Sequence, residues 1–316
     1  MRATFVRALV DLAEQDERTV LLTGDLGFSV VEPFAERFPE RFFNVGVAEQ
    51  NMVGVSTGLA EAGYVPFVYS IATFATLRSY EFVRNGPVLH RLPVRIVGVG
   101  GGLEYGMNGL THYALEDIAV MRAQPGMTVL APADHEQARA ALMASRDVQG
   151  PVYFRLGKNE TQTVPGLDGR MRLGRVEQIG AGRDVAIVAT GSIAHEAVAA
   201  VELLEARGWH ARLVVAACLS PAPTDALTDA LKGTRLAVTV EAHYLWGGLG
   251  SLVSEVVAAT GLGCRVVRCG VADLPESVGS EAFMNNAHGL SADAIARTAI
   301  EALEPRDKAA DTVVIR

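Results

Sequence analysis

The chain has 316 residues, 49% of them hydrophobic, so it is long enough to bury a large core and to form two domains. Its 36 acidic residues outnumber its 28 basic residues and give a net charge of -8, which argues against nucleic acid as a partner. Three cysteines without CxxC spacing predict neither a zinc site nor a disulfide framework, and we expect a reducing, cytoplasmic location.

No segment has the pattern of a signal peptide or a membrane helix. The first residues, MRATFVRALVDLAEQDE, include Arg7 and Asp11 before any apolar run of signal length. No later segment approaches the length of a membrane span. We therefore expect an unprocessed protein with no membrane partner.

The first half of the chain predicts a parallel α/β sheet. Apolar side chains have helical spacing over residues 3–14, and a short buried strand follows at 19–25. Further strand-like runs, separated by helical patterns, occur at residues 42–45, 65–71, 94–100, 127–132 and 152–157. This alternation is typical of a parallel sheet covered on both faces, so we assign residues 1–157 to one α/β domain.

The second half predicts another, smaller α/β domain at residues 183–316. Residues 158–182 are polar and rich in turn formers, and we interpret them as a linker. Strands are predicted after it at residues 184–190, 211–217, 235–240 and 264–269, with helices between them. The predicted fold class is thus two successive parallel-sheet α/β domains, in which ligands collect at the carboxyl ends of the strands.

One segment near such a strand end, NVGVAEQNMVGVSTGL at residues 44–59, carries an acid, Glu49, among small and apolar residues. With the stretch up to YSIATFATLRSYEFV, and with GLTHYALEDIAVMRAQPGMTVLAPAD further on, it resembles the pyrimidine-binding domain of transketolases. TVEAHYLWGGLGSLVSEVV and ATGSIAHEAV resemble the transketolase C-terminal domain. The resemblance covers essentially the whole chain. It implies the C-terminal half of a transketolase, or the small subunit of a split one, which transfers a two-carbon ketol unit.

The resemblance assigns four residues to the cofactor, thiamine diphosphate. Glu49 corresponds to the glutamate that hydrogen-bonds the aminopyrimidine ring and favours its imino tautomer, and Phe74 to the aromatic that stacks on that ring. Ile71 takes the place of a second aromatic, and Asp25 lies near the cofactor. Without the motif, a helix-dipole acid, a core phenylalanine and a turn aspartate would explain the same residues.

Five further residues are assigned to the substrate. His112, in GLTHY, matches the histidine that contacts the reacting carbonyl or hydroxyl, and Ser29 matches a substrate-side serine. Three positions depart from the family: Asn108 replaces an aspartate, Gly100 a histidine and Lys158 an arginine. Because the last two belong to a phosphate clamp, we expect an acceptor that is non-standard or unphosphorylated.

A missing motif predicts a partner. Thiamine enzymes hold Mg²⁺ and diphosphate through GDG and a downstream asparagine, and this chain has no GDG. No metal ligand is therefore assigned here. The resemblance implies a diphosphate-binding partner subunit, which supplies the Mg²⁺ ligands, in an α2β2 heterotetramer.

Two alternative functions stay open at this point. One is the β subunit of a 2-oxoacid dehydrogenase decarboxylating component, and the other is a non-catalytic scaffold. In the second domain, Ser192 is expected to cap a helix, although strand-end amides beside it offer an anion site. His243 and the turn at Trp246 are expected to serve subunit packing.

Overall fold

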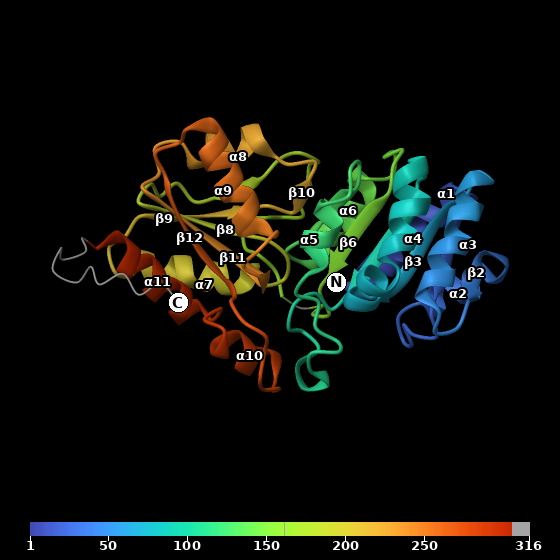
Figure 1. Ribbon diagram of the computed structural model, residues 1–316. Helices are drawn as coiled ribbons and strands as arrows, with labels where there is room; N and C mark the ends of the chain where they lie inside the picture. Colours follow the sequence, from blue (N-terminus) through green and yellow to red (C-terminus); the bar gives the residue numbers. More distant parts are fainter. Residues whose placement is uncertain (161, 305–316) are drawn as a thin grey trace.

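The computed structural model describes residues 1–160 and 162–304, and it contains two mixed, mainly parallel sheets side by side (Figure 1). Every strand expected from the sequence is present, and the predicted fold class is confirmed. The end of the expected second domain, residues 305–316, lies outside the described part. Among the described residues, no helix has the length and apolar character needed to cross a bilayer.

The first sheet has seven strands in the order β10-β5-β6-β4-β3-β1-β2. All neighbouring pairs are parallel except β10 with β5. The strands are β1 (Thr19–Thr23), β2 (Phe42–Asn44), β3 (Val65–Ile71), β4 (Arg95–Val99), β5 (Thr128–Leu130), β6 (Val152–Leu156) and β10 (Cys218–Ser220).

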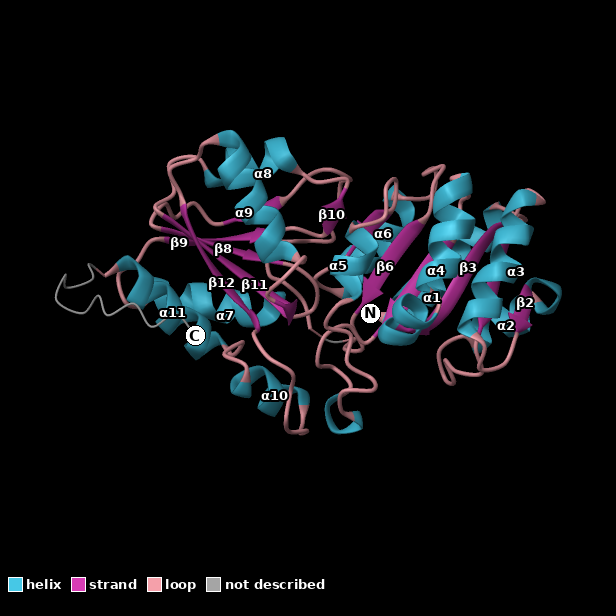
Figure 2. Ribbon diagram, viewed as in Figure 1, coloured by secondary structure: helices cyan, strands magenta, loops and turns pink. Residues whose placement is uncertain are grey.

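Helices cover both faces of this sheet, as Figure 2 shows. On one face α1 (Arg2–Gln15), α2 (Glu32–Arg37) and α6 (His135–Ala144) bury side chains such as Phe5 and Phe34. On the other face lie α3 (Glu49–Glu61), α4 (Tyr80–Val83) and α5 (Asp117–Arg122). Adjacent strand residues point to opposite faces, so Leu21 joins the first core and Leu22 the second.

The second sheet has five strands in the order β12-β11-β8-β9-β7. These strands are β7 (Glu177–Ile179), β8 (Val185–Ala189), β9 (Ala211–Val215), β11 (Leu236–Tyr244) and β12 (Arg265–Val271). Its helices are α7 (Ala194–Glu205), α8 (Thr224–Leu231), α9 (Leu249–Thr260), α10 (Glu281–Ala287) and α11 (Ala292–Leu303). Helices α7 and α11 pack on one face, and α8 and α9 on the other.

Two short strands were not expected from the sequence. Strand β7 lies within the stretch interpreted as a linker and pairs antiparallel with β9 at the edge of the second sheet. Strand β10 follows β9 in sequence but pairs antiparallel with β5 of the first sheet. The second half of the chain therefore contributes a strand to the first sheet and ties the two units together.

A buried ion pair lies where the two units meet. Arg155, at the end of β6, donates from Nε to Asp117 Oδ2 at 2.8 Å, and both side chains are at most 3% exposed. Its Nη2 donates to the carbonyl oxygens of Ala114 and Ala242, at 2.9 and 2.8 Å. Of these bonds, only the one to Ala242 crosses to the second sheet, and as a hydrogen bond from a charged group it contributes about 1.5 to 3 kcal/mol.

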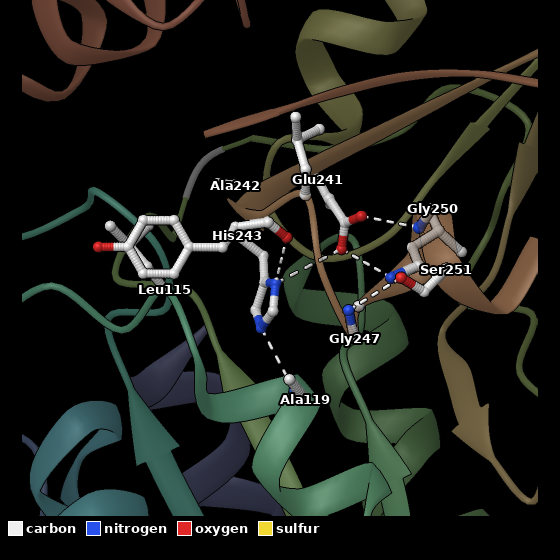
Figure 3. Close-up of polar contacts among 12 residues, drawn as sticks. Leu115, Ala119, Glu241, Ala242, His243, Gly247, Gly250 and Ser251 are labelled. Atoms are coloured by element: carbon white, nitrogen blue, oxygen red, sulfur yellow. Dashed lines mark hydrogen bonds and ion pairs between the residues drawn. The ribbon is translucent and has the colours of Figure 1, made fainter. Parts of the chain in front are cut away.

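The end of β11 makes a second link between the two units, through His243, next to a carboxylate that holds α9 within the second unit (Figure 3). The fully buried carboxylate of Glu241 accepts the backbone N–H groups of Leu249 and Gly250, at the N-terminus of α9. His243 Nε2 accepts from the N–H of Ala119 in α5, at 3.3 Å. The expectation that His243 serves subunit packing is wrong, because its side chain is fully buried between two parts of the same chain.

Candidate active site

The acid singled out in the sequence begins helix α3, beside the carboxyl end of β1. The side chain of Glu49 is 3% exposed, and a Cβ atom added to Gly24 would lie 3.9 Å from its Oε1. Within this chain the carboxylate has a cationic partner that the sequence did not indicate. Arg78 Nη1 lies 3.1 Å from both Oε1 and Oε2 of Glu49.

Arg78 also begins a row of stacked side chains, which we call the aromatic row. Its members are Arg78, Phe74, His112, Tyr105 and Lys158. The guanidinium carbon of Arg78 lies 3.7 Å from the centroid of the Phe74 ring, and the Phe74 and His112 rings are 5.3 Å apart. The His112 and Tyr105 rings are 5.6 Å apart, and Lys158 Nζ lies 4.2 Å from the Tyr105 ring. Both contacts of a cation with a ring are within the range of cation–π attraction.

The position of Phe74 follows from a wide helical turn after β3. Residues Phe74–Arg78 form a π-helical turn, a form that often occurs at functional sites. Thr76 and Ser79, both buried, donate their hydroxyls to the backbone carbonyls of Ala72 and Ala75, and such bonds favour local bending. Phe74 and Arg78 are four residues apart, so their side chains lie on one side of this turn.

The glycine-rich loop after β4 brings His112 and Tyr105 into the row. Gly100 has φ +75°, and a Cβ added to it would lie 2.1 Å from Tyr105 Cε2, so the tyrosine ring takes the space of any side chain there. The hydroxyl of Tyr113 donates to the Gly106 carbonyl at 2.6 Å and folds the loop back. Asn108 ends the 3₁₀ turn η4 (Gly106–Asn108) and is exposed.

The second domain holds this loop through Glu104. Ser192, after β8, donates its hydroxyl to Glu104 Oε1, and the backbone N–H of Lys158 donates to Oε2. Burial and the nearby charge of Glu281 raise the pKa of the Glu104 carboxyl to about 7. The expectation that Ser192 caps a helix is wrong: α7 begins after Ile193 without a side-chain cap, and the hydroxyl bonds Glu104 instead.

The loop after β1 holds two of the predicted residues in an unusual backbone conformation. Asp25 has φ +58° and Ser29 φ +65°, in the left-handed region that residues other than glycine seldom adopt. Asn44 Nδ2 donates to Asp25 Oδ1 at 3.2 Å, and Ser29 donates its N–H to Glu32 Oε1 at 2.7 Å. Such conformations cost about 1 to 3 kcal/mol and cluster at functional sites.

The structure thus brings some predicted residues into one row and leaves others around it. Glu49, Phe74, His112 and Lys158 are joined directly or through one intervening side chain. Among the described residues, no ring contact or hydrogen bond links the side chains of Ser29, Ile71 or Asn108 to that row. Their roles stay predictions.

Three residues near the row were missed by the sequence reasoning: Arg78, Tyr105 and Arg2. The Nε of Arg2 is buried without a hydrogen-bond partner among the described residues. Burial raises the pKa of Tyr105 to about 12, and the positive charge of Arg2 acts in the opposite direction. An arginine four residues after Phe74 was the one available signal, because that spacing places both side chains on one helical face.

No group of three or more histidine, cysteine, aspartate or glutamate side chains in the described part of the chain is arranged to hold a metal ion. The polar groups of the row are instead one imidazole, one phenol and two cations, with the Glu49 carboxylate beside Arg78.

Comparison with protein families decides the classification. Residues 1–163 match the transketolase pyrimidine-binding domain, and residues 174–295 match the transketolase C-terminal domain. The chain belongs to the transketolase family. Enzymes of the transketolase family use thiamine diphosphate, and the resemblance inferred from the motifs is confirmed.

Individual relatives are similar to this chain over nearly its whole length. A putative transketolase C-terminal section of Methanocaldococcus jannaschii is 35% identical, over 96% of both chains. The 6-deoxy-6-sulfo-D-fructose transketolase subunit SqwH of a Clostridium species is 36% identical, over 97% of this chain and 95% of the relative. A solved split-gene transketolase, described as an inactive β4 tetramer, is 38% identical with a TM-score of 0.87, over 96% of this chain and 97% of that one.

Because the pKa of Glu104 is raised by folding, stability should depend on pH. The folded chain binds the proton of Glu104 more tightly than the unfolded chain, whose pKa is near 4.5. Compared with a Glu104→Gln variant, the wild type should lose on the order of 3 kcal/mol of unfolding free energy as the pH rises from about 4.5 to 7, and no more above that. Urea unfolding of both proteins between pH 5 and 8 checks this. A stability difference that is constant with pH, or that grows in favour of the wild type, would contradict it.

Proposed function

We propose that the chain is the small subunit of a split, transketolase-type transferase, which moves a two-carbon ketol unit from a ketose donor to an aldehyde acceptor. The observation that carries this proposal is the grouping of a buried acid, Glu49, with Phe74 and His112 in a chain that matches transketolases over its length. The substrates are small sugars or keto compounds. They bind beside His112, which transfers protons to or from the substrate oxygen.

Thiamine diphosphate fits the first end of the aromatic row. A buried carboxylate can share a proton with a ring nitrogen, and the face of Phe74 can hold the plane of an aminopyrimidine. When bound, this cofactor supplies the nucleophilic carbon that attacks the substrate carbonyl. We assign Glu49 the proton exchange with the ring and Phe74 its orientation, and we place Asp25 and Ile71 in the wall of the same pocket.

We infer that Mg²⁺ and the diphosphate are held by a second polypeptide, which corresponds to the N-terminal half of a transketolase. The missing GDG motif supports this inference. Since each site then needs both chains, and since most oligomers are symmetric, an α2β2 heterotetramer is the proposed assembly.

We propose a cytoplasmic location. The cysteines Cys218, Cys264 and Cys269 are free and buried, which fits a reducing cytoplasm.

Neither alternative function is favoured. The relatives described above are transketolase subunits or sections, which does not favour a 2-oxoacid dehydrogenase subunit. A non-catalytic scaffold would not require Glu49, Phe74 and His112 to lie in one group, as they do here.

The first test concerns Glu49. In the assembled complex, Glu49→Gln should slow hydrogen–deuterium exchange at the thiazolium carbon by at least ~10²-fold, because an amide cannot transfer the required proton. His112→Ala should leave that exchange unchanged and lower turnover. Glu61→Gln, at the exposed far end of the same helix, is the matched control. An exchange rate unaffected by Glu49→Gln would remove this residue from the mechanism.

The other end of the aromatic row, at Lys158, bears on which acceptor the enzyme uses. We propose an acceptor other than an ordinary sugar phosphate, bound near Ser29, Gly100, Asn108, His112 and Lys158. Lys158 Nζ is already engaged with the Tyr105 ring and with the Glu104 carbonyl at 3.4 Å, so it is a weaker phosphate ligand than a free arginine fork. Two relatives are named for uncommon sugars, a sulfo-sugar and apulose 4-phosphate, which supports a non-standard acceptor but does not decide whether it carries a phosphate.

Steady-state kinetics with matched acceptors test this proposal. The reconstituted complex, given one ketose donor, should prefer D-glyceraldehyde 3-phosphate over D-glyceraldehyde by less than about a thousandfold in kcat/KM, or roughly 4 kcal/mol. A larger preference would mean that the complex holds an intact phosphate clamp, with Arg2 or a partner residue taking part, and the proposal would fail.

A further inference from the structure

The contacts of Arg78 are the same two that the proposed function assigns to the cofactor ring. Its Nη1 lies 3.1 Å from each oxygen of Glu49, and its guanidinium lies 3.7 Å from the Phe74 centroid. A guanidinium is planar and delocalised, with N–H donors at its edge, and it stacks on aromatic rings. An aminopyrimidine ring shares these properties. Two groups cannot occupy one face of Phe74 and one side of Glu49 at the same time.

The geometry of the pair shows that it can be displaced. A strong arginine–carboxylate pair uses two nitrogens in parallel, whereas here one nitrogen contacts both oxygens. The side chain of Arg78 is 46% exposed, so much of the guanidinium reaches water. Glu49 is 3% exposed, so its carboxylate depends on this one cation for charge compensation within the described part of the chain.

We propose that Arg78 is a positioning residue for Glu49 that competes with the aminopyrimidine ring for the same place. It holds the carboxylate toward the carboxyl end of β1 and covers the face of Phe74. It must then move aside when the ring binds. This inference rests on the proposed function, because it takes from there the roles of Glu49 and Phe74.

Two consequences follow, and they have opposite signs. Arg78 stabilises the subunit, because it compensates a buried carboxylate. It also weakens cofactor binding, because the ring must displace it. A residue that merely contacted the bound cofactor would strengthen binding, so the sign of the effect on affinity separates the two roles.

The affinity experiment uses the complete two-chain complex, titrated with thiamine diphosphate in the presence of Mg²⁺ and followed by calorimetry. Arg78→Ala should lower the Kd by at least threefold relative to the wild type. Arg84→Ala removes an exposed arginine six residues further on and is the matched control, with a Kd equal to that of the wild type. An unchanged or higher Kd for Arg78→Ala overturns the proposal. A wild-type complex that binds no thiamine diphosphate overturns the proposed function itself.

A stability experiment on the separate full-length subunit gives a second readout. Arg78→Ala should lower Tm by about 2 °C or more, since roughly 1 kcal/mol corresponds to a few degrees in a chain of this size. In a Glu49→Gln background the same substitution should lower Tm by less than half as much, because a neutral amide needs no cation. Arg78→Lys keeps the charge and should retain most of the stability. Equal losses in both backgrounds would show a role unconnected with Glu49 and would overturn the proposal.

Discussion

The site depends on one constraint, which is the charge balance of Glu49. A carboxylate with 3% exposure at the start of a helix must be compensated, and the helix dipole alone contributes only about 0.3 to 1 kcal/mol. The chain meets this need with Arg78, which reaches over Phe74 from a π-helical turn. The π-helical turn after β3 and helix α3 beside β1 thus bring the two charges together, and the proposed cofactor site uses the same acid.

The second domain acts on the site from a distance. Its contacts do not include Glu49, but Ser192 bonds Glu104 next to Tyr105, and His243 accepts from the N–H of Ala119 in α5. The buried pair of Arg155 and Asp117 joins the same region. These links fix the glycine-rich loop that carries His112. A pyrimidine-type domain by itself would leave that loop with one side unsupported.

The sequence predicted the fold well because most of its strands are buried on both faces and are mainly apolar, although β2 and β12 are partly exposed. Strands β7 and β10 were not predicted, since each has three residues and is defined by antiparallel pairing with a distant strand. Within the site, Glu49 and Phe74 could be predicted because each lies in a short stretch of sequence that resembles the family motif. The motif did not indicate Arg78 as their partner, because a π turn decides where that side chain points. Ser192 and His243 were misjudged for a related reason, since their partners belong to the other domain.

We propose that this chain provides one half of a thiamine diphosphate site and functions only when a second chain provides the other half. Calorimetric titration of thiamine diphosphate and Mg²⁺ into the purified chain, into its diphosphate-binding partner chain and into their mixture tests it most directly. We expect negligible binding by this chain alone, and binding at one site per pair of chains in the mixture. Tight binding by the isolated chain would contradict it.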